Sequence, residues 1–173
     1  DSILISKSYS QDQSNKVEIE GTMFDAWVVI SGVDAVAPLN AFEFALSYGG
    51  TVLGAQSVVD GGFLLAPSIV LQDDLTVPDV NFAVSTLLPT GAVGDGVLAA
   101  ITLEALMAGT ASLELTQVDL SAPFGVPIAV GGIADAEVNV QQASTPGTIV
   151  LMLAGVAALS TVRRPERRFG SRG

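Results

Sequence analysis

Apolar and polar residues alternate along most of the first 141 residues of this chain. In the segment Phe42–Tyr48 every second residue is large and apolar, and the residues between are small or polar. A period of two is typical of a strand with one face buried against a core. Helical periodicity is weak in this part of the chain, so the pattern predicts β-structure.

The remaining segments of this kind are short and are separated by turns rich in glycine and proline. Together with an irregular edge strand expected within the otherwise loop-like segment 63–79, they give roughly nine strands, with turn signals every ~8–15 residues. This spacing predicts an all-β fold, an antiparallel β-sandwich. The other expected strands are Val17–Glu20, Phe24–Ser31, Val52–Val59, Val80–Ser85, Val97–Ala105, Ala111–Val118 and Ala136–Gln141.

The end of the chain follows a different pattern. Thr148–Val162 carries no charge, follows the pair Pro146-Gly147, and runs directly into Arg163 and Arg164. All five arginines of the protein lie in its final eleven residues. An apolar segment closed by arginines is typical of a chain that stops in a bilayer with its C-terminus in the cytoplasm.

The length of this apolar segment leaves two interpretations open. Fifteen residues in a helix span roughly 22 Å, whereas the hydrocarbon core of a bilayer is ~30 Å thick. Local thinning and snorkelling arginines would allow a membrane anchor. The alternative is a buried core helix or a frayed C-terminal element, although a core helix has no need of the arginine cluster.

The charge is segregated along the chain. Residues 1–147 contain 17 of the 18 acidic residues but only two basic ones, Lys7 and Lys16, for a net charge of −15. This balance argues against nucleic acid and against anionic membrane surfaces as partners, because both require a basic footprint. It is compatible with a soluble exported domain, a basic partner or a divalent cation, and the simplest interpretation is a solubilising surface.

Several kinds of chemistry are excluded by residue types that the sequence lacks. It has no cysteine and no histidine, which excludes disulfides, thiolate and imidazole catalysis, and zinc sites built on these residues. No Ser-x-x-Lys motif supplies an activated serine. We therefore expect a protein that is not an enzyme and that needs no cofactor. The chain begins at Asp1 without methionine, as expected of a form whose signal peptide has been removed.

Acidic residues in the loops are candidate ligands for calcium, which prefers oxygen donors. The candidates are Asp73, Asp74 and Asp79, which lie close together in the sequence, with Asp60, Asp95 and Asp119 from elsewhere. None of them has the spacing of an EF-hand loop, so a solvated acidic loop is the alternative. Trp27, the only tryptophan, is expected in the core or on a sheet face.

The body of the chain resembles a cohesin domain over about residues 17–140. The first half matches in a strand of the form aromatic-x-aromatic-x-Leu-x-Tyr, followed by a short turn and a Val-Leu pair; its residues are Phe42, Phe44, Leu46, Tyr48, Val52 and Leu53. The second half matches in a glycine-rich turn, an alternating strand and a Gly-Thr turn, with residues Gly94, Gly96, Leu98, Ile101, Leu103, Ala105, Gly109 and Thr110. The resemblance implies a jelly-roll sandwich that binds a dockerin partner through a sheet face.

The tail resembles the C-terminal sorting signals that exosortase-type enzymes process, in which a short proline motif precedes an apolar segment and arginines. The motif here is Thr145-Pro146-Gly147, where the usual form is Pro-Glu-Pro. The tail therefore predicts an exported protein at the cell surface, with a sorting or anchor helix that is open to cleavage.

These patterns divide the chain into four parts. They are a cohesin-like sandwich (1–141), a linker with the sorting motif (142–147), an anchor helix (148–162) and a basic cytoplasmic tail (163–173). The expected function is a non-catalytic interaction module with a dockerin-type partner. Two alternatives remain: an envelope protein that self-associates through edge strands, and a carbohydrate-binding module, which requires an exposed strip of aromatic rings.

Overall fold

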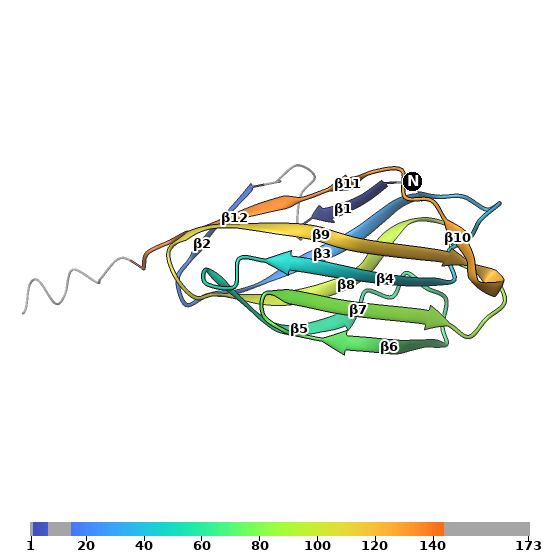
Figure 1. Cartoon of the computed structure of the whole chain (residues 1–173), viewed down its shortest axis with the longest axis horizontal. Coiled ribbons are helices and arrows are strands. Elements are labelled where there is room, and N and C mark those ends of the chain that lie inside the picture. The colour runs from blue at the N-terminus through green and yellow to red at the C-terminus, as the bar shows by residue number, and fades with distance from the viewer. Residues whose placement is uncertain (1, 7–14, 144–173) are drawn as a thin grey trace, which may run out of the picture. The chain divides into compact units, whose positions relative to one another are not determined.

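The computed structural model describes residues 2–6 and 15–143, which form a two-layer sandwich of β-strands (Figure 1). The first sheet has five strands in the order β11-β1-β3-β8-β5. Their bounds are Ile133–Ala134 (β11), Ser2–Ser6 (β1), Met23–Val33 (β3), Gly94–Ala105 (β8) and Leu53–Asp60 (β5).

The second sheet has seven strands, six of them in the order β2-β12-β9-β4-β7-β6, with β10 paired to β9. Their bounds are Asn15–Ile19 (β2), Ala136–Gln141 (β12), Gly109–Ala122 (β9), Ala41–Tyr48 (β4), Asp79–Thr86 (β7), Ser68–Asp74 (β6) and Val126–Ile128 (β10). A single 3-10 turn, η1 (Pro123–Gly125), is the only helical element among the described residues.

The core lies between the two sheets and is built by the predicted alternation. In β4 the large apolar residues face inward and are buried. Phe42, Phe44 and Phe82 of β7 form an aromatic cluster with ring centroids 6.0–6.2 Å apart. From the opposite sheet, Leu98, Ile101 and Leu103 of β8 are also fully buried. Each such side chain contributes about 1.5–3 kcal/mol relative to an exposed position.

The structure corrects the expected strand count and orientation. Twelve strands are present in the described residues rather than about nine, because β1, β10 and β11 were not predicted. The sandwich is also not purely antiparallel, since β1 pairs with β11 and β2 pairs with β12 in parallel. β10 and β11 have only two or three residues, too few for a readable alternation, and β1 has three consecutive apolar residues in place of an alternation. β1 and β11 form because strands distant in sequence lie beside them, whereas β10 pairs with the strand directly before it, β9.

The segment expected to hold an irregular edge strand contains β6. This strand is the last in its sheet and pairs only with β7, with a register shift between Val70 and Gln72. Nearly all of its residues are exposed, which explains why its alternation was weak.

All twelve described strands belong to one unit of the chain that ends at Gln142. The predicted anchor helix 148–162 and the basic residues after it lie outside the described residues. Within residues 2–6 and 15–143, no helix is long and apolar enough to cross a membrane.

Candidate functional site

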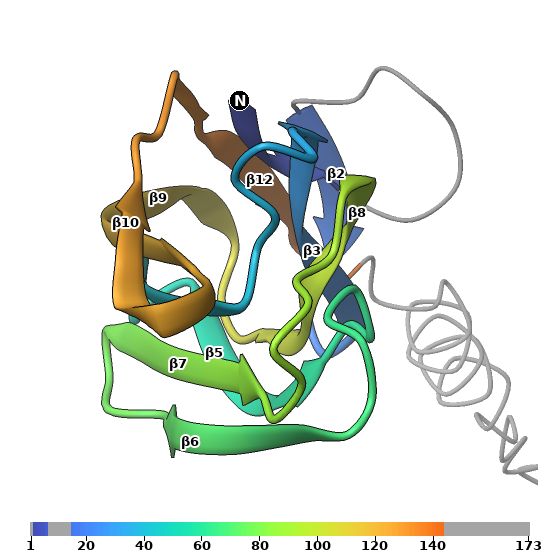
Figure 2. The same ribbon diagram turned by 90° about the vertical axis from the view of Figure 1, so that its right-hand side faces the viewer.

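β6, β7, β4 and β9 are neighbouring strands of the second sheet, and no described helix or strand lies over their outer face (Figures 1 and 2). Register places residues of the four strands in rows across this face. One row runs Gln72–Ala83–Glu43–Asp119. The next row runs Ile69–Ser85–Ala41–Ser121 and continues to Pro127 of β10.

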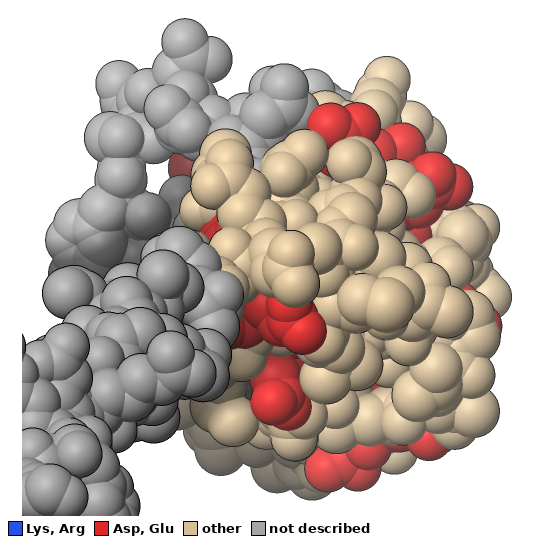
Figure 3. All heavy atoms as spheres, turned by 90° about the vertical axis from the view of Figure 1, so that its left-hand side faces the viewer, with Lys and Arg blue, Asp and Glu red and all other residues tan. Residues whose placement is uncertain are grey.

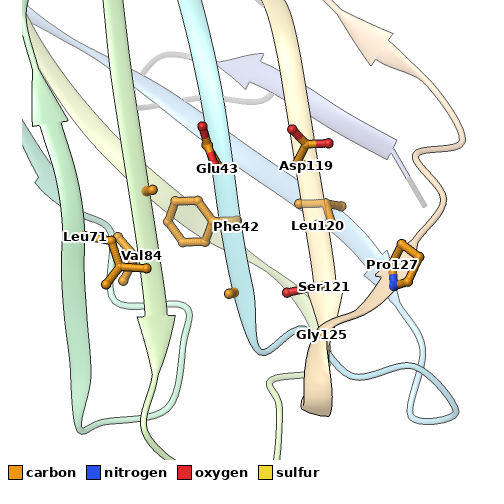
Figure 4. A pocket seen from close by; sticks show the side chains of 11 residues that line it. Phe42, Glu43, Leu71, Val84, Asp119, Leu120, Ser121, Gly125 and Pro127 are labelled. Carbon is orange, nitrogen blue, oxygen red and sulfur yellow. The ribbon is translucent and has the colours of Figure 1, made fainter.

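The middle of this face is recessed, because most of its outward side chains are small. The outward residues of β4 are Ala41, Glu43, Ala45 and Ser47, and those of β7 include Ala83 and Ser85. An open hollow of about 280 Å³ lies over these strands. Leu71 of β6 borders it on one side, and Gly125 and Pro127 border it on the other (Figure 4).

Two carboxylates stand in this hollow. Glu43 and Asp119 are direct cross-strand partners on β4 and β9, and both are exposed. The amide Nε2 of Gln117 donates to Asp119 Oδ2 at 2.8 Å. Like charges directly opposite each other in a sheet are destabilising by roughly 0.2–1 kcal/mol. The fold does not require two carboxylates at these positions. A positively charged group that bound between Glu43 and Asp119 would relieve their repulsion, so this part of the face favours a cationic ligand group.

Residues 15–143 contain fifteen acidic residues and one basic residue, Lys16. Lys16 lies on β2 in the row of Val138 and Ala111, eight residues along β9 from Asp119, so it is not beside the Glu43–Asp119 pair. Figure 3 shows one end of the domain, where several Asp and Glu side chains and no Lys or Arg reach the described surface. The described domain is therefore electronegative as a whole.

A second hollow, of about 490 Å³, lies at one end of the sandwich between the loops around Gly61–Leu65 and Gly91–Val97. Its lining is mostly glycine and apolar residues, and a Cβ added at Gly96 would collide with the ring of Phe63. Its one carboxylate, Asp95, already accepts a hydrogen bond from the backbone N of Gly32 at 2.7 Å. This hollow offers fewer free polar groups than the sheet face.

The calcium candidates do not form a ligand cage. Asp73 and Asp74 lie on the exposed edge strand β6, and Asp79 begins β7. Asp74 Oδ1 accepts a hydrogen bond from Thr76 Oγ1 at 2.7 Å. Across the described ranges, no three acidic residues are grouped closely enough to hold a metal. The sorting residues Pro146, Gly147, Arg163 and Arg164 lie outside the described part of the chain.

The aromatic residues do not form a strip on the described surface. Trp27 is a sheet-face residue, half-buried on the outer side of β3 and in register with Ala100. Most of the other described aromatic rings are in the core. The one exposed aromatic ring of the described residues is Phe124, in η1. Sequence reasoning missed Phe124, although its position between Pro123 and Gly125 marks a turn.

Sequence reasoning also did not bring Glu43 and Asp119 together. Asp119 was considered only as one of several calcium ligands, and Glu43 only as one of the small or polar residues between the apolar positions of Phe42–Tyr48. The two residues are 76 positions apart in the chain, and only the pairing of β4 with β9 places them side by side.

No protein-family model matches this chain, and no curated protein sequence is similar to it. Solved structures share its fold. A cohesin module of a family 33 glycoside hydrolase from Clostridium perfringens superimposes with a TM-score of 0.67 at 16% identity, covering 82% of this chain and 97% of the module. A non-cellulosomal cohesin from the archaeon Archaeoglobus fulgidus gives a TM-score of 0.61 at 16% identity, covering 87% of this chain and 96% of that one.

A third similar structure comes from a type I cohesin–dockerin complex of Clostridium thermocellum, with a TM-score of 0.64 and 12% identity over 82% of this chain and 94% of that one. The similarity spans nearly the whole length of each of these modules. The described domain therefore has a cohesin-like fold, as the sequence resemblance predicted.

Proposed function

We propose that this domain is a non-catalytic protein-binding module that takes a dockerin-type partner on the outer face of β6, β7, β4 and β9. The observation that carries the proposal is the hollow on that uncovered face, lined from several strands and containing the Glu43–Asp119 pair. The cohesin-like fold supports it, because solved cohesins with this fold include one in a complex with a dockerin.

The face is suited to binding a protein because it is formed in advance. Its residues lie on paired strands, so little backbone entropy is lost when a partner docks. The small side chains of β4 and β7 allow a partner to approach closely, and few long side chains have to be immobilised.

The charge of the face indicates the chemistry of the partner. A lysine or arginine that reaches Glu43 and Asp119 would relieve the repulsion between these two carboxylates. The net negative charge of the domain would in addition accelerate the encounter with a basic surface. The partner is therefore expected to present at least one basic side chain at the centre of its contact.

Export and retention at the cell surface complete the proposal. The tail supports them, with its Pro146-Gly147 pair, its uncharged segment 148–162 and the arginines that follow. In this arrangement the domain is displayed outside the cell, either anchored or released after cleavage of the tail.

The test is binding of purified dockerin modules encoded in the same genome, measured by calorimetry. We expect a dissociation constant in the micromolar range or tighter for at least one of them. Reversing both charges, Glu43→Lys with Asp119→Lys, should weaken that binding at least tenfold. Asp25→Lys, on the outer face of the other sheet, is the matched control and should leave it unchanged. A lack of micromolar binding to every candidate contradicts the proposal.

A second function, self-association through edge strands, is favoured by one observation. Ile69, Val70 and Leu71 of the edge strand β6 are 43%, 46% and 66% exposed. An edge with unpaired backbone groups and apolar side chains can accept a strand from another copy. Light scattering after size-exclusion chromatography tests for self-association. If the protein remains monomeric over a wide concentration range, this second function is excluded.

A further inference from the structure

The connection between β9 and β10 is a tight hairpin with an aromatic residue at its tip. Ala122 pairs with Val126, so Pro123, Phe124 and Gly125 form a three-residue loop. Figure 2 views the sandwich from the end at which this hairpin lies; the hairpin is next to the label β10.

Phe124 is held in an unfavourable backbone conformation. Its φ is 65° and its ψ is 19°, in the left-handed region, and it is the only residue other than glycine with positive φ in the described chain. An L-residue with a bulky side chain is strained there, whereas glycine is not and asparagine is tolerated. The neighbouring Gly125, with φ of 75°, shows what the turn itself prefers.

The ring of Phe124 is also unfavourably placed for the isolated domain. Phe124 is 96% exposed, the highest value among the large apolar side chains of the described residues. Folding therefore gains nothing from burying the ring, and the turn would be more stable with a glycine. A strained residue that contributes no packing points to a role outside the fold.

The position of the hairpin connects Phe124 to the binding face. The next residue, Gly125, and Pro127 both line the hollow that contains Glu43 and Asp119 (Figure 4). The three residues from Asp119 to Ala122 on β9 span roughly 10 Å. Phe124 thus stands at the rim of the face, with the carboxylates toward its centre.

We propose that Phe124 is the apolar anchor of the partner interface and inserts its ring into an apolar pocket of the partner. This inference rests on the proposed function and specifies the partner further. The partner would present an apolar pocket and, roughly 10–15 Å away, a lysine or arginine for Glu43 and Asp119. Aromatic side chains that become buried on binding are often the residues that dominate an interface.

Substitutions at Phe124 separate a binding role from a structural one, because the two roles predict opposite changes in stability. In the full chain, Phe124→Gly should raise the melting temperature by about 2–4 °C by removing the strain. The same substitution should weaken binding of the dockerin module at least about 30-fold, the loss typical of an interface anchor. Phe124→Ala should weaken binding equally with little change in melting temperature, and Phe124→Leu should retain most of the affinity.

Met107→Ala is the matched control: Met107 is an apolar side chain, 51% exposed, in the turn between β8 and β9, and its removal should change affinity less than about threefold. If Phe124→Gly binds like the wild type, this inference is wrong and the proposed function stands. If Phe124→Gly lowers the melting temperature by several degrees, the ring is structural and the inference is again wrong. If no dockerin module binds the wild-type chain, both the inference and the proposed function are overturned.

Discussion

At the scale of single residues, Tyr48 illustrates how a buried polar atom limits stability. Tyr48 is 3% exposed, and its Oη is buried without a hydrogen-bonding partner among the described residues. Leaving such a group unpaired costs about 1–3 kcal/mol. Tyr48→Phe removes the hydroxyl and keeps the ring, so it should raise the free energy of unfolding by about 1 kcal/mol.

Urea unfolding of the wild type and Tyr48→Phe measures this difference. Tyr48→Leu serves as the control, because it removes the ring as well and should be less stable than the wild type. A Tyr48→Phe protein that unfolds at a lower urea concentration would contradict the prediction and would show that the hydroxyl is hydrogen-bonded.

Thr86 is the opposite case, a buried hydroxyl with several partners. Apart from the aromatic Tyr48, it is the only buried residue with a polar side chain among those described. Its Oγ1 donates to the carbonyl of Leu65 at 2.7 Å and accepts from the backbone N of Leu88 at 3.1 Å. Thr86→Val preserves the shape but leaves these backbone groups unpaired, so it should cost about 1–3 kcal/mol of stability.

Thr86→Ser retains the hydroxyl and should lose less than Thr86→Val. Hydrogen exchange of the Leu88 amide provides a local readout, since the valine variant should exchange faster there. Equal stability of the valine and serine variants would show that these hydrogen bonds contribute little.

At the scale of elements, the question is whether the segment 148–162 belongs to the sandwich or to a membrane. The last described strand, β12, ends at Gln141. It pairs with β9 on one side and with β2 on the other. Deleting Thr148–Gly173 should therefore leave the melting temperature of the domain unchanged and convert a membrane-associated protein into a soluble one.

Fractionation and circular dichroism of the full-length and truncated forms measure both effects. A third form, with Arg163, Arg164, Arg167 and Arg168 replaced by glutamine, should be retained less well, because flanking basic residues determine where an apolar segment stops. A full-length protein that is soluble, together with a truncated one that is unfolded, would mean that 148–162 is a core element.

At the scale of the whole molecule, the dominant feature is the net negative charge. Residues 1–147 carry a net charge of −15, and like charges repel in the compact state. Salt should stabilise the domain by screening. Because no group of three acidic residues is suited to a metal in the described ranges, we expect millimolar calcium to stabilise mainly by the same screening.

The measurement is the melting temperature in calcium chloride and in sodium chloride at equal ionic strength. Equal shifts support screening. A clearly larger shift with calcium that is lost in Asp73→Asn with Asp74→Asn would show a specific site at these residues.

The sequence predicted the strands that bury one face because their alternation is a local property. The buried positions of β4 and the end of β12 at Gln141 were correctly predicted in this way. The core residues of β8 follow the same rule. The cohesin-like fold could also be predicted from the sequence, because the strand and turn residues that resemble a cohesin domain occur in the same order along this chain.

The tertiary structure alone decided which residues share the outer face of β6, β7, β4 and β9. Glu43 and Asp119 face each other because β9 lies beside β4, a pairing between strands distant in sequence. The same holds for the parallel pairings of β1 with β11 and of β2 with β12, because each joins segments that are distant in sequence. The strain at Phe124 likewise depends on a φ angle imposed by the pairing of β9 with β10. Local patterns report which residues are buried, but juxtaposition across a sheet and backbone strain exist only once the chain has folded.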